Sequence, residues 1–386
     1  MSSVKHEMSR LKVHEVSLVS FAPLQSILCC PFSKQPLTLI TLPELLSQLP
    51  KGELERVPQG TVGAFVSKHA MLAYPIIGHI IDFLKEDALK LSEALDLSFK
   101  STASEASAAR QNVKQWYDHF GWKRNHNGIY NDVAFFSEIN NTGYKHYELL
   151  SHLSLTPRFL GGGQFILDAA SGAIALPEYH SYSWYYRYRV CVDLSLAALQ
   201  NASTELQDRG FYCLADICHL PFVDDVFDGI ISGYTIQHVP ETEQRKAVAE
   251  LYRVLKPTKH LCLTASVKTT SIRRIILNLL NLQRRLLRKL LPASTEPTVI
   301  HKSHASPKPP HNLYAYLKDC KWWSRIISDL NVSSFSIESH RLFSKREFEF
   351  LFGTSTRSAR VLRGIETLFP KLIAKISDHI MIDVQK

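Results

Sequence analysis

The chain has 386 residues, of which 45% are hydrophobic, and a formal net charge of +9 at pH 7. This length exceeds the usual size of a single core, so two domains are expected. No stretch reaches the roughly 18 to 20 apolar residues of a membrane-spanning helix, and the first residues lack the apolar core of a secretory signal. The seven cysteines form no C-x-x-C pair, which is typical of free thiols in a reducing compartment. We therefore expect a cytoplasmic protein without disulfides, whose charge permits but does not require a polyanionic partner.

The N-terminal region carries a cysteine-containing motif. The segment "LQSILCCPFSKQPLTLI" (24–40) and a later stretch around "LAYPIIGHI" resemble small zinc-ribbon-like domains, in which C-P-x-C introduces a zinc knuckle. Tetrahedral zinc needs about four Cys or His ligands. The motif here reads Cys30-Pro-Phe-Ser and has no second cysteine pair, which leaves Cys29, His69 and His79 as the remaining ligands for recruitment. We expect residues 1–95 to form an α+β domain that kept its β core, lost its metal and acts as a docking or substrate-covering module.

A small, polar segment follows at residues 96–111 and predicts a linker or a short exposed helix. The next stretch, 113–136, is dense in aromatic residues. One interpretation is a helix that packs its aromatics on a sheet. The other is a lid that walls an active site, with Tyr117, Trp122 and Tyr130 in contact with cofactor or substrate.

From residue 164 onward, apolar strand-like runs alternate with segments of helical periodicity. This alternation indicates a parallel sheet covered by helices, an α/β fold. The runs are "QFILDA" (164–169), "YRVCVDL" (188–194), "FYCLAD" (211–216), "FDGIISG" (227–233) and "HLCLTAS" (260–266), with two later β-like runs at 332–343 and 378–386.

In such sheets, ligands bind beyond the carboxyl ends of the strands. A dinucleotide site needs G-x-G-x-x-G after the first strand, so that the backbone can approach a pyrophosphate. The loop after "QFILD" instead reads Ala-Ala-Ser-Gly-Ala-Ile, and the triple glycine at 161–163 lies before the strand. The sequence therefore disfavours an NAD site.

The order of acids after successive strands resembles the class I S-adenosylmethionine-dependent methyltransferases over residues 112–386. The resemblance implies a Rossmann-like fold with a mostly parallel seven-stranded sheet and S-adenosylmethionine as cofactor. It implies that Asp168, Ala170 and Gly172 hold the methionine part of the cofactor. It further assigns the ribose hydroxyls to Asp193 and the adenine amine to Asp216, with Leu194 and Ile217 packing on the adenine faces. A carboxylate suits a vicinal diol because it accepts two hydrogen bonds.

The segment 220–257, "LPFVDDVFDGIISGYTIQHVPETEQRKAVAELYRVLKP", also looks like the fourth-strand region of that family. The chain departs from the family pattern D-x-G-x-G-x-G at Ala170 and Ile174, although "SGAIALPEY" is similar to a bacterial subgroup with Ser-Gly followed by Pro-Glu-Tyr. The alternative for Asp168 and Asp193 is that they cap the helices that follow their strands.

Methyl transfer from a sulfonium depends mainly on positioning and needs a general base only if the nucleophile must lose a proton. His238, after the fourth strand, is the candidate base, or else an orienting histidine, and Tyr130 is the second catalytic candidate. We expect a small-molecule or lipid-linked acceptor. The alternatives are an RNA methyltransferase, favoured by the basic charge, and a catalytically silent methyltransferase-like binding protein, favoured by the eroded glycines.

The segment 271–291, "SIRRIILNLLNLQRRLLRKLL", predicts an amphipathic helix. Arg273, Arg274 and the basic residues of 284–289 fall opposite its apolar stripe. It either covers the sheet with that stripe and exposes its arginines, or makes peripheral contact with an anionic membrane or a phosphorylated acceptor. The residues of the stripe are Ile272, Ile275, Ile276, Leu279, Leu286, Leu287 and Leu290. A proline-rich loop is expected behind the helix, at 294–311.

Overall fold

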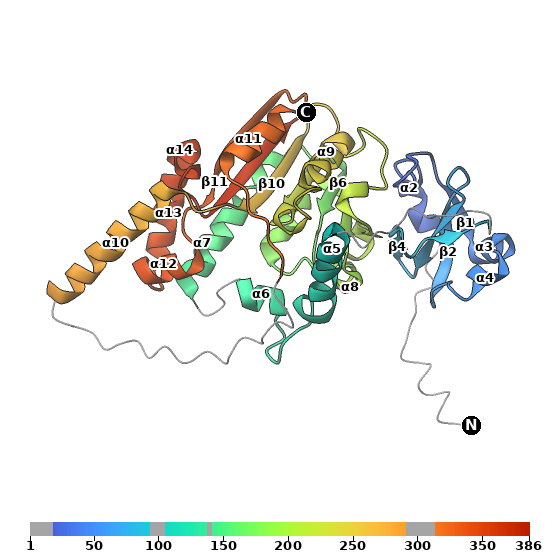
Figure 1. Ribbon diagram of the computed structural model, residues 1–386, viewed down its shortest axis with the longest axis horizontal. Coiled ribbons are helices and arrows are strands. Elements are labelled where there is room, and N and C mark those ends of the chain that lie inside the picture. Colours follow the sequence, from blue (N-terminus) through green and yellow to red (C-terminus); the bar gives the residue numbers. More distant parts are fainter. Residues whose placement is uncertain (1–17, 93–104, 137–140, 291–312) are drawn as a thin grey trace. The chain divides into compact units, whose positions relative to one another are not determined.

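The computed structural model describes residues 18–92, 105–136, 141–290 and 313–386 (Figure 1). The chain divides into two compact units. The first comprises Met1–Lys100 with the short segments Tyr212–Ala215 and Pro221–Val223, and the second comprises the rest. The sequence predicted domains at 1–95 and 112–386. The structure adds the two short segments to the first unit, which their position in the sequence could not indicate.

The first unit, in its described residues, is a small, mainly antiparallel sheet with three short α-helices and a 3-10 turn. Its strands follow in the order β1-β2-β3-β4, β5 pairs with β3, and β4 pairs in parallel with Tyr212–Leu214. α3 begins with a capping box between Thr41 and Glu44 and buries Leu45 against β2 and β3. The elements are η1 (Leu18–Phe21), α2 (Ala22–Gln25), β1 (Thr38–Thr41), α3 (Leu42–Gln48), α4 (Lys51–Leu54), β2 (Thr61–Ser67), β3 (Leu72–Ile77), β4 (Ile80–Asp82) and β5 (Leu89–Lys90).

The two adjacent cysteines of this unit are buried and form no disulfide within the described residues. The sulfur of Cys30 lies 3.2 Å from the Tyr74 hydroxyl and accepts the backbone N–H of Ser33 at 3.4 Å. Within the residues described, no group of three or more His, Cys, Asp or Glu side chains is placed to hold a metal ion. The loss of zinc remains a prediction, as does the zinc-ribbon origin of the unit.

The second unit is built on a mixed sheet in the order β7-β6-β9-β10-β12-β11. β7, β6, β9 and β10 are parallel, and β12 runs against both of its neighbours. Phe211, at the start of β8, packs against Tyr188 of β7. The strands are β6 (Gly163–Ala169), β7 (Tyr186–Asp193), β9 (Gly229–Gly233), β10 (His260–Ser266), β11 (Ser334–Arg341) and β12 (His379–Gln385), and β8 (Gly210–Leu214) begins in this unit while its residues from Tyr212 onward belong to the first. Each begins within a few residues of a predicted run, and the expected Rossmann-like arrangement is confirmed.

Helices pack around this sheet, and α10 extends away from it (Figure 1). They are α5 (Glu105–Trp116), α6 (Asn131–Phe136), α7 (Thr142–Leu153), α8 (Leu196–Leu206), α9 (Gln244–Val254), α10 (Ser271–Leu290), α11 (Cys320–Ser328), α12 (Lys345–Phe352), α13 (Thr356–Leu368) and α14 (Pro370–Ala374). A π-helical segment, η2 (Tyr117–Gly121), follows α5, and the short 3-10 helices are η3 (Thr156–Phe159), η4 (Pro177–Ser183), η5 (Gln207–Arg209), η6 (Ile217–His219) and η7 (Ile236–His238). In the described ranges, no helix is long and apolar enough to cross a lipid bilayer.

The segment expected as a linker, 96–111, differs from the structure in its second half. Residues from Glu105 onward form the start of α5, which buries Ala109, Val113 and Trp116. A small polar composition predicted exposure, but alanine fits closely against a neighbouring element and here gives the helix a buried face. Residues 96–104 and the expected loop at 294–311 lie outside the described residues.

Candidate functional site

The first acid of the predicted site lies in a buried ion pair. Asp168 is the next-to-last residue of β6, and Arg189 on the neighbouring strand β7 donates to its carboxylate through Nε at 2.9 Å and through Nη2. Arg189 also donates to the carbonyl of Tyr179 at 2.6 Å. Both side chains of the pair are almost fully buried. Asp168 therefore anchors the first-strand loop, and its contact with a cofactor remains a prediction.

The loop after β6 contains one glycine but has the left-handed backbone conformation that glycine favours at three positions. Ala170, Gly172 and Ile174 all have positive φ angles, of 58°, 57° and 52°. Ala170 and Ile174 are the two positions at which the chain departs from the family's glycine pattern. L-residues pay about 1 to 2 kcal/mol for this conformation. The loop therefore retains the geometry that the glycines usually allow, at the expense of local strain.

Two features require glycine at position 172, its positive φ angle and a neighbouring aromatic ring. A Cβ atom at this position would lie 2.6 Å from Cζ2 of Trp122. Trp122 stacks on Tyr117 with ring centroids 5.4 Å apart and meets Tyr130 edge-on at 6.0 Å. The three predicted lid aromatics therefore come together against the cofactor loop. The indole N–H of Trp122 is buried and has no hydrogen-bond partner in the described structure.

The second acid closes β7 and binds two backbone amides. Asp193 Oδ2 accepts the N–H of Gly172 at 2.9 Å, and Oδ1 accepts the N–H of Ser195 at 2.9 Å. Burial raises the pKa of Asp193 to about 6, although the two backbone hydrogen bonds oppose the shift. Ser195 caps α8 and donates from its hydroxyl to Asp118 at 2.5 Å. The cap of α8 is thus Ser195, and Asp193 instead ties the first-strand loop to the second strand.

The third acid, Asp216, follows β8 and caps the turn η6. Arg110 of α5 lies 2.9 Å from its Oδ2 and also pairs with Glu243. Burial alone would raise the pKa of Asp216, but the hydrogen bond from His219 and the charge of Arg110 outweigh it, so that the pKa is lowered. Next to the two acids, Ile217 is buried and Leu194 is partly exposed. The acids thus come to the carboxyl ends of successive strands, as predicted.

The two predicted catalytic residues have different surroundings. His238, in η7, has its Nδ1 2.7 Å from the carbonyl oxygen of Tyr314. Burial lowers its pKa, although that carbonyl opposes the shift. Tyr130 stacks beneath Arg124, which donates to its hydroxyl at 2.8 Å. Because a carbonyl can only accept, Nδ1 of His238 is the donor of its hydrogen bond, and the catalytic roles of His238 and Tyr130 remain predictions.

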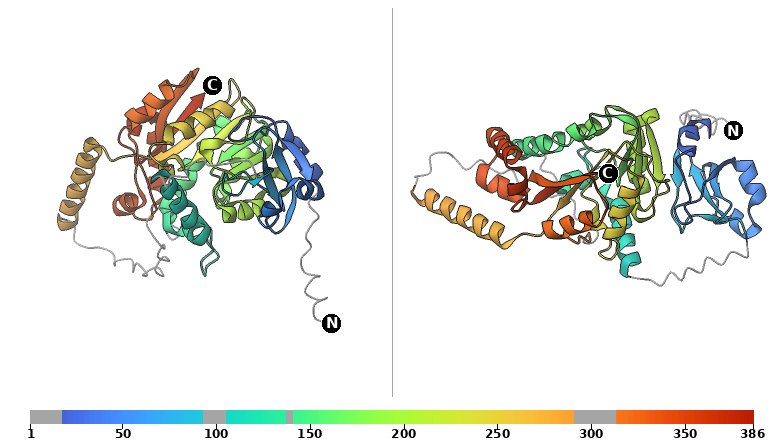
Figure 2. Two further views of the ribbon diagram at one scale, coloured as in Figure 1. Left: turned by 45° about the vertical axis from the view of Figure 1, so that its right-hand side comes forward. Right: turned by 90° about the horizontal axis from the view of Figure 1, so that it is seen from above.

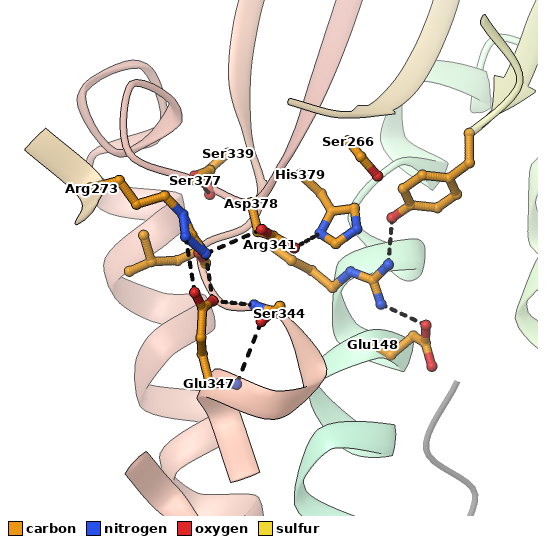
Figure 3. Close-up of polar contacts among 12 residues, drawn as sticks. Glu148, Ser266, Arg273, Ser339, Arg341, Ser344, Glu347, Ser377, Asp378 and His379 are labelled. Carbon is orange, nitrogen blue, oxygen red and sulfur yellow. Dashed lines mark hydrogen bonds and ion pairs between the residues drawn. The ribbon is translucent and has the colours of Figure 1, made fainter. Parts of the chain in front are cut away.

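A second polar cluster lies at the carboxyl ends of β9 and β11 (Figure 3). Arg341, the last residue of β11, donates to Glu148 of α7 at 2.5 Å and to the hydroxyl of Tyr234 at 2.7 Å. Tyr234 directly follows β9 and has a positive φ of 54°. A bulky residue in this conformation is a strained feature that often accompanies function. The arginine is buried, and its Nε has no partner in the described structure.

Histidines surround this cluster. The ring of His152 lies 5.2 Å from that of His340, and its Nδ1 is 3.0 Å from the hydroxyl of Tyr182. Burial and the charge of Arg341 lower the pKa of His152 to about 3, and burial lowers the pKa of His340 well below its usual range. Both rings are therefore neutral. His379 lies at the start of β12, beside Asp378 (Figure 3).

Residues 167–263, which contain the three acids and His238, match a protein family described as "Methyltransferase domain". This segment is therefore similar to methyltransferase domains. The matched range runs from the end of β6 to the middle of β10 and includes the whole predicted cofactor edge. The predicted methyltransferase and its cofactor, S-adenosylmethionine, are supported by this match.

Similar proteins carry related names. The chain is 36% identical over 74 residues to demethylmenaquinone methyltransferase of Lactiplantibacillus plantarum, which covers 19% of this chain and 30% of that protein. It is 37% identical over 70 residues to methyltransferase GfsG of Streptomyces halstedii, covering 18% and 24%. The chain thus spans less than a third of the length of these relatives. A Haemonchus contortus phosphoethanolamine N-methyltransferase 1 structure matches 73% of this chain and 50% of that one, with 10% identity and a TM-score of 0.44, a similarity too low to carry an argument.

Three arginines of the site were not predicted from the sequence. Arg189 interrupts an apolar strand, which was a visible signal, because a buried guanidinium requires an anionic partner. Arg110 and Arg341 gave no such signal. Arg110 lies in a segment expected as a linker, and Arg341 lies at the end of a strand whose partners are far away in the sequence.

Proposed function

We propose that the protein is an S-adenosylmethionine-dependent methyltransferase that acts on a small-molecule or lipid-linked acceptor. The observation that carries this proposal is the match of residues 167–263 to a methyltransferase domain. It coincides with carboxylates at the ends of β7 and β8 in the positions that family uses for its cofactor.

The residues at this edge fit such a cofactor. Each oxygen of Asp193 already accepts one backbone N–H and retains a lone pair for a ribose hydroxyl. The unpartnered indole N–H of Trp122 lies beside Gly172 and is available to a polar group of the ligand. When bound, S-adenosylmethionine supplies an electrophilic methyl group on a sulfonium. The chain contributes orientation through its carboxylates and exclusion of water through the lid aromatics.

The acceptor is proposed to lie beside Tyr234. Because the Tyr234 hydroxyl accepts a hydrogen bond from Arg341, its own proton can be donated to an oxygen atom of the methyl acceptor. His238 is the proposed base for acceptors that must lose a proton. With Nδ1 donating to Tyr314, Nε2 is the acceptor nitrogen of the ring. It receives one long contact, from the amide nitrogen of Gln237 at 3.4 Å, which the methyl acceptor would have to replace before Nε2 could take its proton.

Two measurements test this proposal. Calorimetry with the purified protein should detect S-adenosylmethionine binding, and cofactor labelled in its methyl group should transfer label to the small-molecule or lipid fraction of a cell extract. The Tyr234→Phe variant should bind the cofactor normally and transfer label more slowly. Label found in RNA alone would replace the acceptor class. Absence of cofactor binding would instead favour the silent binding protein.

For the first unit, we propose a metal-free relative of zinc-ribbon-like domains that docks a partner or covers the substrate. The hydrogen bond between Cys30 and Tyr74 supports this, because it satisfies the sulfur without a metal. Elemental analysis of the purified protein should find no zinc. One equivalent of zinc, with unfolding of the domain on chelation, would overturn the proposal.

A further inference from the structure

The apolar stripe of α10 faces solvent. Five exposed apolar side chains, at alternating steps of three and four residues, lie on this face of the helix. Each is between 50% and 64% exposed. The interpretation in which this stripe covers the sheet is therefore wrong. The exposed residues are Ile272, Ile275, Leu279 and Leu286 of the predicted stripe, together with Leu282. Ile276 is half-buried, and the side chains of Leu287 and Leu290 lie outside the described residues.

The opposite side of α10 fastens the helix to the second unit. Arg273, expected to face solvent, is 3% exposed and pairs with Glu347 at 2.5 Å and Asp378 at 3.2 Å (Figure 3). Leu277 and Leu280 pack on the aromatic core formed by α7, α12 and α13. Because a buried arginine requires anionic partners, this pairing sets the rotation of the helix. The apolar stripe consequently points away from the unit that holds it, and α10 projects from that unit in both views of Figure 2.

A second exposed apolar stripe lies on α13 and α14, at the same end of the second unit (Figure 1). Its side chains are between 42% and 73% exposed. Together, the two stripes contain half of the exposed large hydrophobic side chains in the described part of the chain. Concentration of such residues on neighbouring helices marks an interaction surface. The residues of the second stripe are Val361, Ile365, Leu368, Phe369 and Leu372.

The charge of these helices selects the partner. Residues 271–290 contain six Arg and Lys residues and no acid. In residues 356–375, the one acid, Glu366, is fully buried and paired with Arg363. Arg274, Arg357, Lys371 and Lys375 are exposed. A second copy of the chain would bring two cationic helices together without an acid to neutralise them. An anionic surface is instead complementary to both helices.

We propose that α10 and the α13–α14 stripe bind the surface of an anionic lipid bilayer. An apolar face flanked by cations is the pattern of helices that lie in the membrane interface. The 20 residues of α10 span about 30 Å, enough for several turns to contact lipid. Binding is reversible, because each cation near such a surface contributes only about a fivefold gain in affinity and is screened by salt. This inference does not depend on methyl transfer, since it concerns a surface remote from the acids of the cofactor edge.

The test is sedimentation of the full chain, without cofactor, with vesicles of phosphatidylcholine alone or mixed with an equal part of phosphatidylglycerol. The wild type should sediment with the anionic vesicles at low salt and be released at high salt. Two variants separate the contributions. One replaces Ile275, Leu279 and Leu282 with Gln, and the other replaces the four exposed cations named above with Gln. Each should weaken binding at least about tenfold.

Matched controls change the same chemistry elsewhere. Leu46, Leu54 and Leu160 are also exposed, and their replacement with Gln should leave binding unchanged, as should Gln at exposed Lys51, Lys68, Lys123 and Lys145. Circular dichroism checks that every variant is folded. The proposal is overturned if the wild type binds neither vesicle or if a control loses binding equally. It is also overturned if sedimentation equilibrium shows a dimer that the Ile275, Leu279 and Leu282 variant dissociates.

Discussion

Replacement of Asp193 by Asn should make the protein more stable and weaken its binding of cofactor. Burial raises the pKa of this carboxyl from 3.8 to about 6, which corresponds to a loss of about 3 kcal/mol in the free energy of unfolding at neutral pH. Asn keeps the shape and removes the charge. Its oxygen can accept one of the two backbone N–H groups, but its NH₂ group then faces the other, at a cost of about 1 to 2 kcal/mol. The net gain at pH 7.5 is therefore about 1 to 2 kcal/mol.

The sign of the pH dependence follows from the direction of the shift. Because the folded pKa lies above the unfolded value, the stability associated with protonated Asp193 is fully present below about pH 4 and is lost as the pH rises through about 6. The Asn variant has no such loss. The stability difference between variant and wild type should therefore increase from pH 4 to pH 7.5.

Urea denaturation without cofactor, at a series of pH values, measures this difference. Asp208→Asn, at an exposed site of the same unit, should leave stability unchanged. Calorimetry should show about 30- to 150-fold weaker S-adenosylmethionine binding by Asp193→Asn, the loss of a hydrogen-bonded charge. A stability difference that does not vary with pH would refute the buried-charge reasoning. Unchanged affinity would remove Asp193 from the ribose site.

Three further outcomes are expected. Ala170→Gly should be neutral or raise the free energy of unfolding by up to about 1 kcal/mol in urea denaturation, because it relieves a positive φ. Ala169→Gly in β6 should instead lower the free energy of unfolding. Equal losses in the two variants would argue against strain in the loop. Arg189→Met should lower the free energy of unfolding by about 3 to 5 kcal/mol, because it leaves a buried charge unpaired. Adding Asp168→Asn should recover much of this loss. A purely steric role of the arginine would not produce such a recovery. Burial and neighbouring acids raise the pKa of Asp132, in α6, to about 7. The stability of the wild type should therefore fall as the pH rises through that value. A fall of the same size in Asp132→Asn would show that another group titrates.

Much of the second unit could be predicted from the sequence, because its signals are local. The apolar runs of β6, β7 and β8 are short, as expected of strands buried on both faces, although Arg189 interrupts the run of β7. The acids that end these runs reach one edge of the sheet because parallel strands bring their carboxyl ends together. Asp193 and Asp216 could therefore be placed without knowledge of any contact.

The partners of these groups depended on the tertiary structure. Asp168 belongs to an ion pair with Arg189, and Asp216 binds Arg110 from a segment expected to be a linker. Arg341 meets Glu148, which lies 193 positions earlier in the chain. Sequence patterns report periodicity and local composition, whereas ion pairs of this kind are determined by which elements pack against each other.

The orientation of α10 shows the same limit. Its periodicity identified an amphipathic helix, but periodicity is the same whichever face is buried. The burial of Arg273 against Glu347 and Asp378 turns the apolar stripe outward. A buried guanidinium without anions is far more costly than several exposed leucines, so the position of two distant carboxylates, and not the pattern of the helix, determines which face meets solvent.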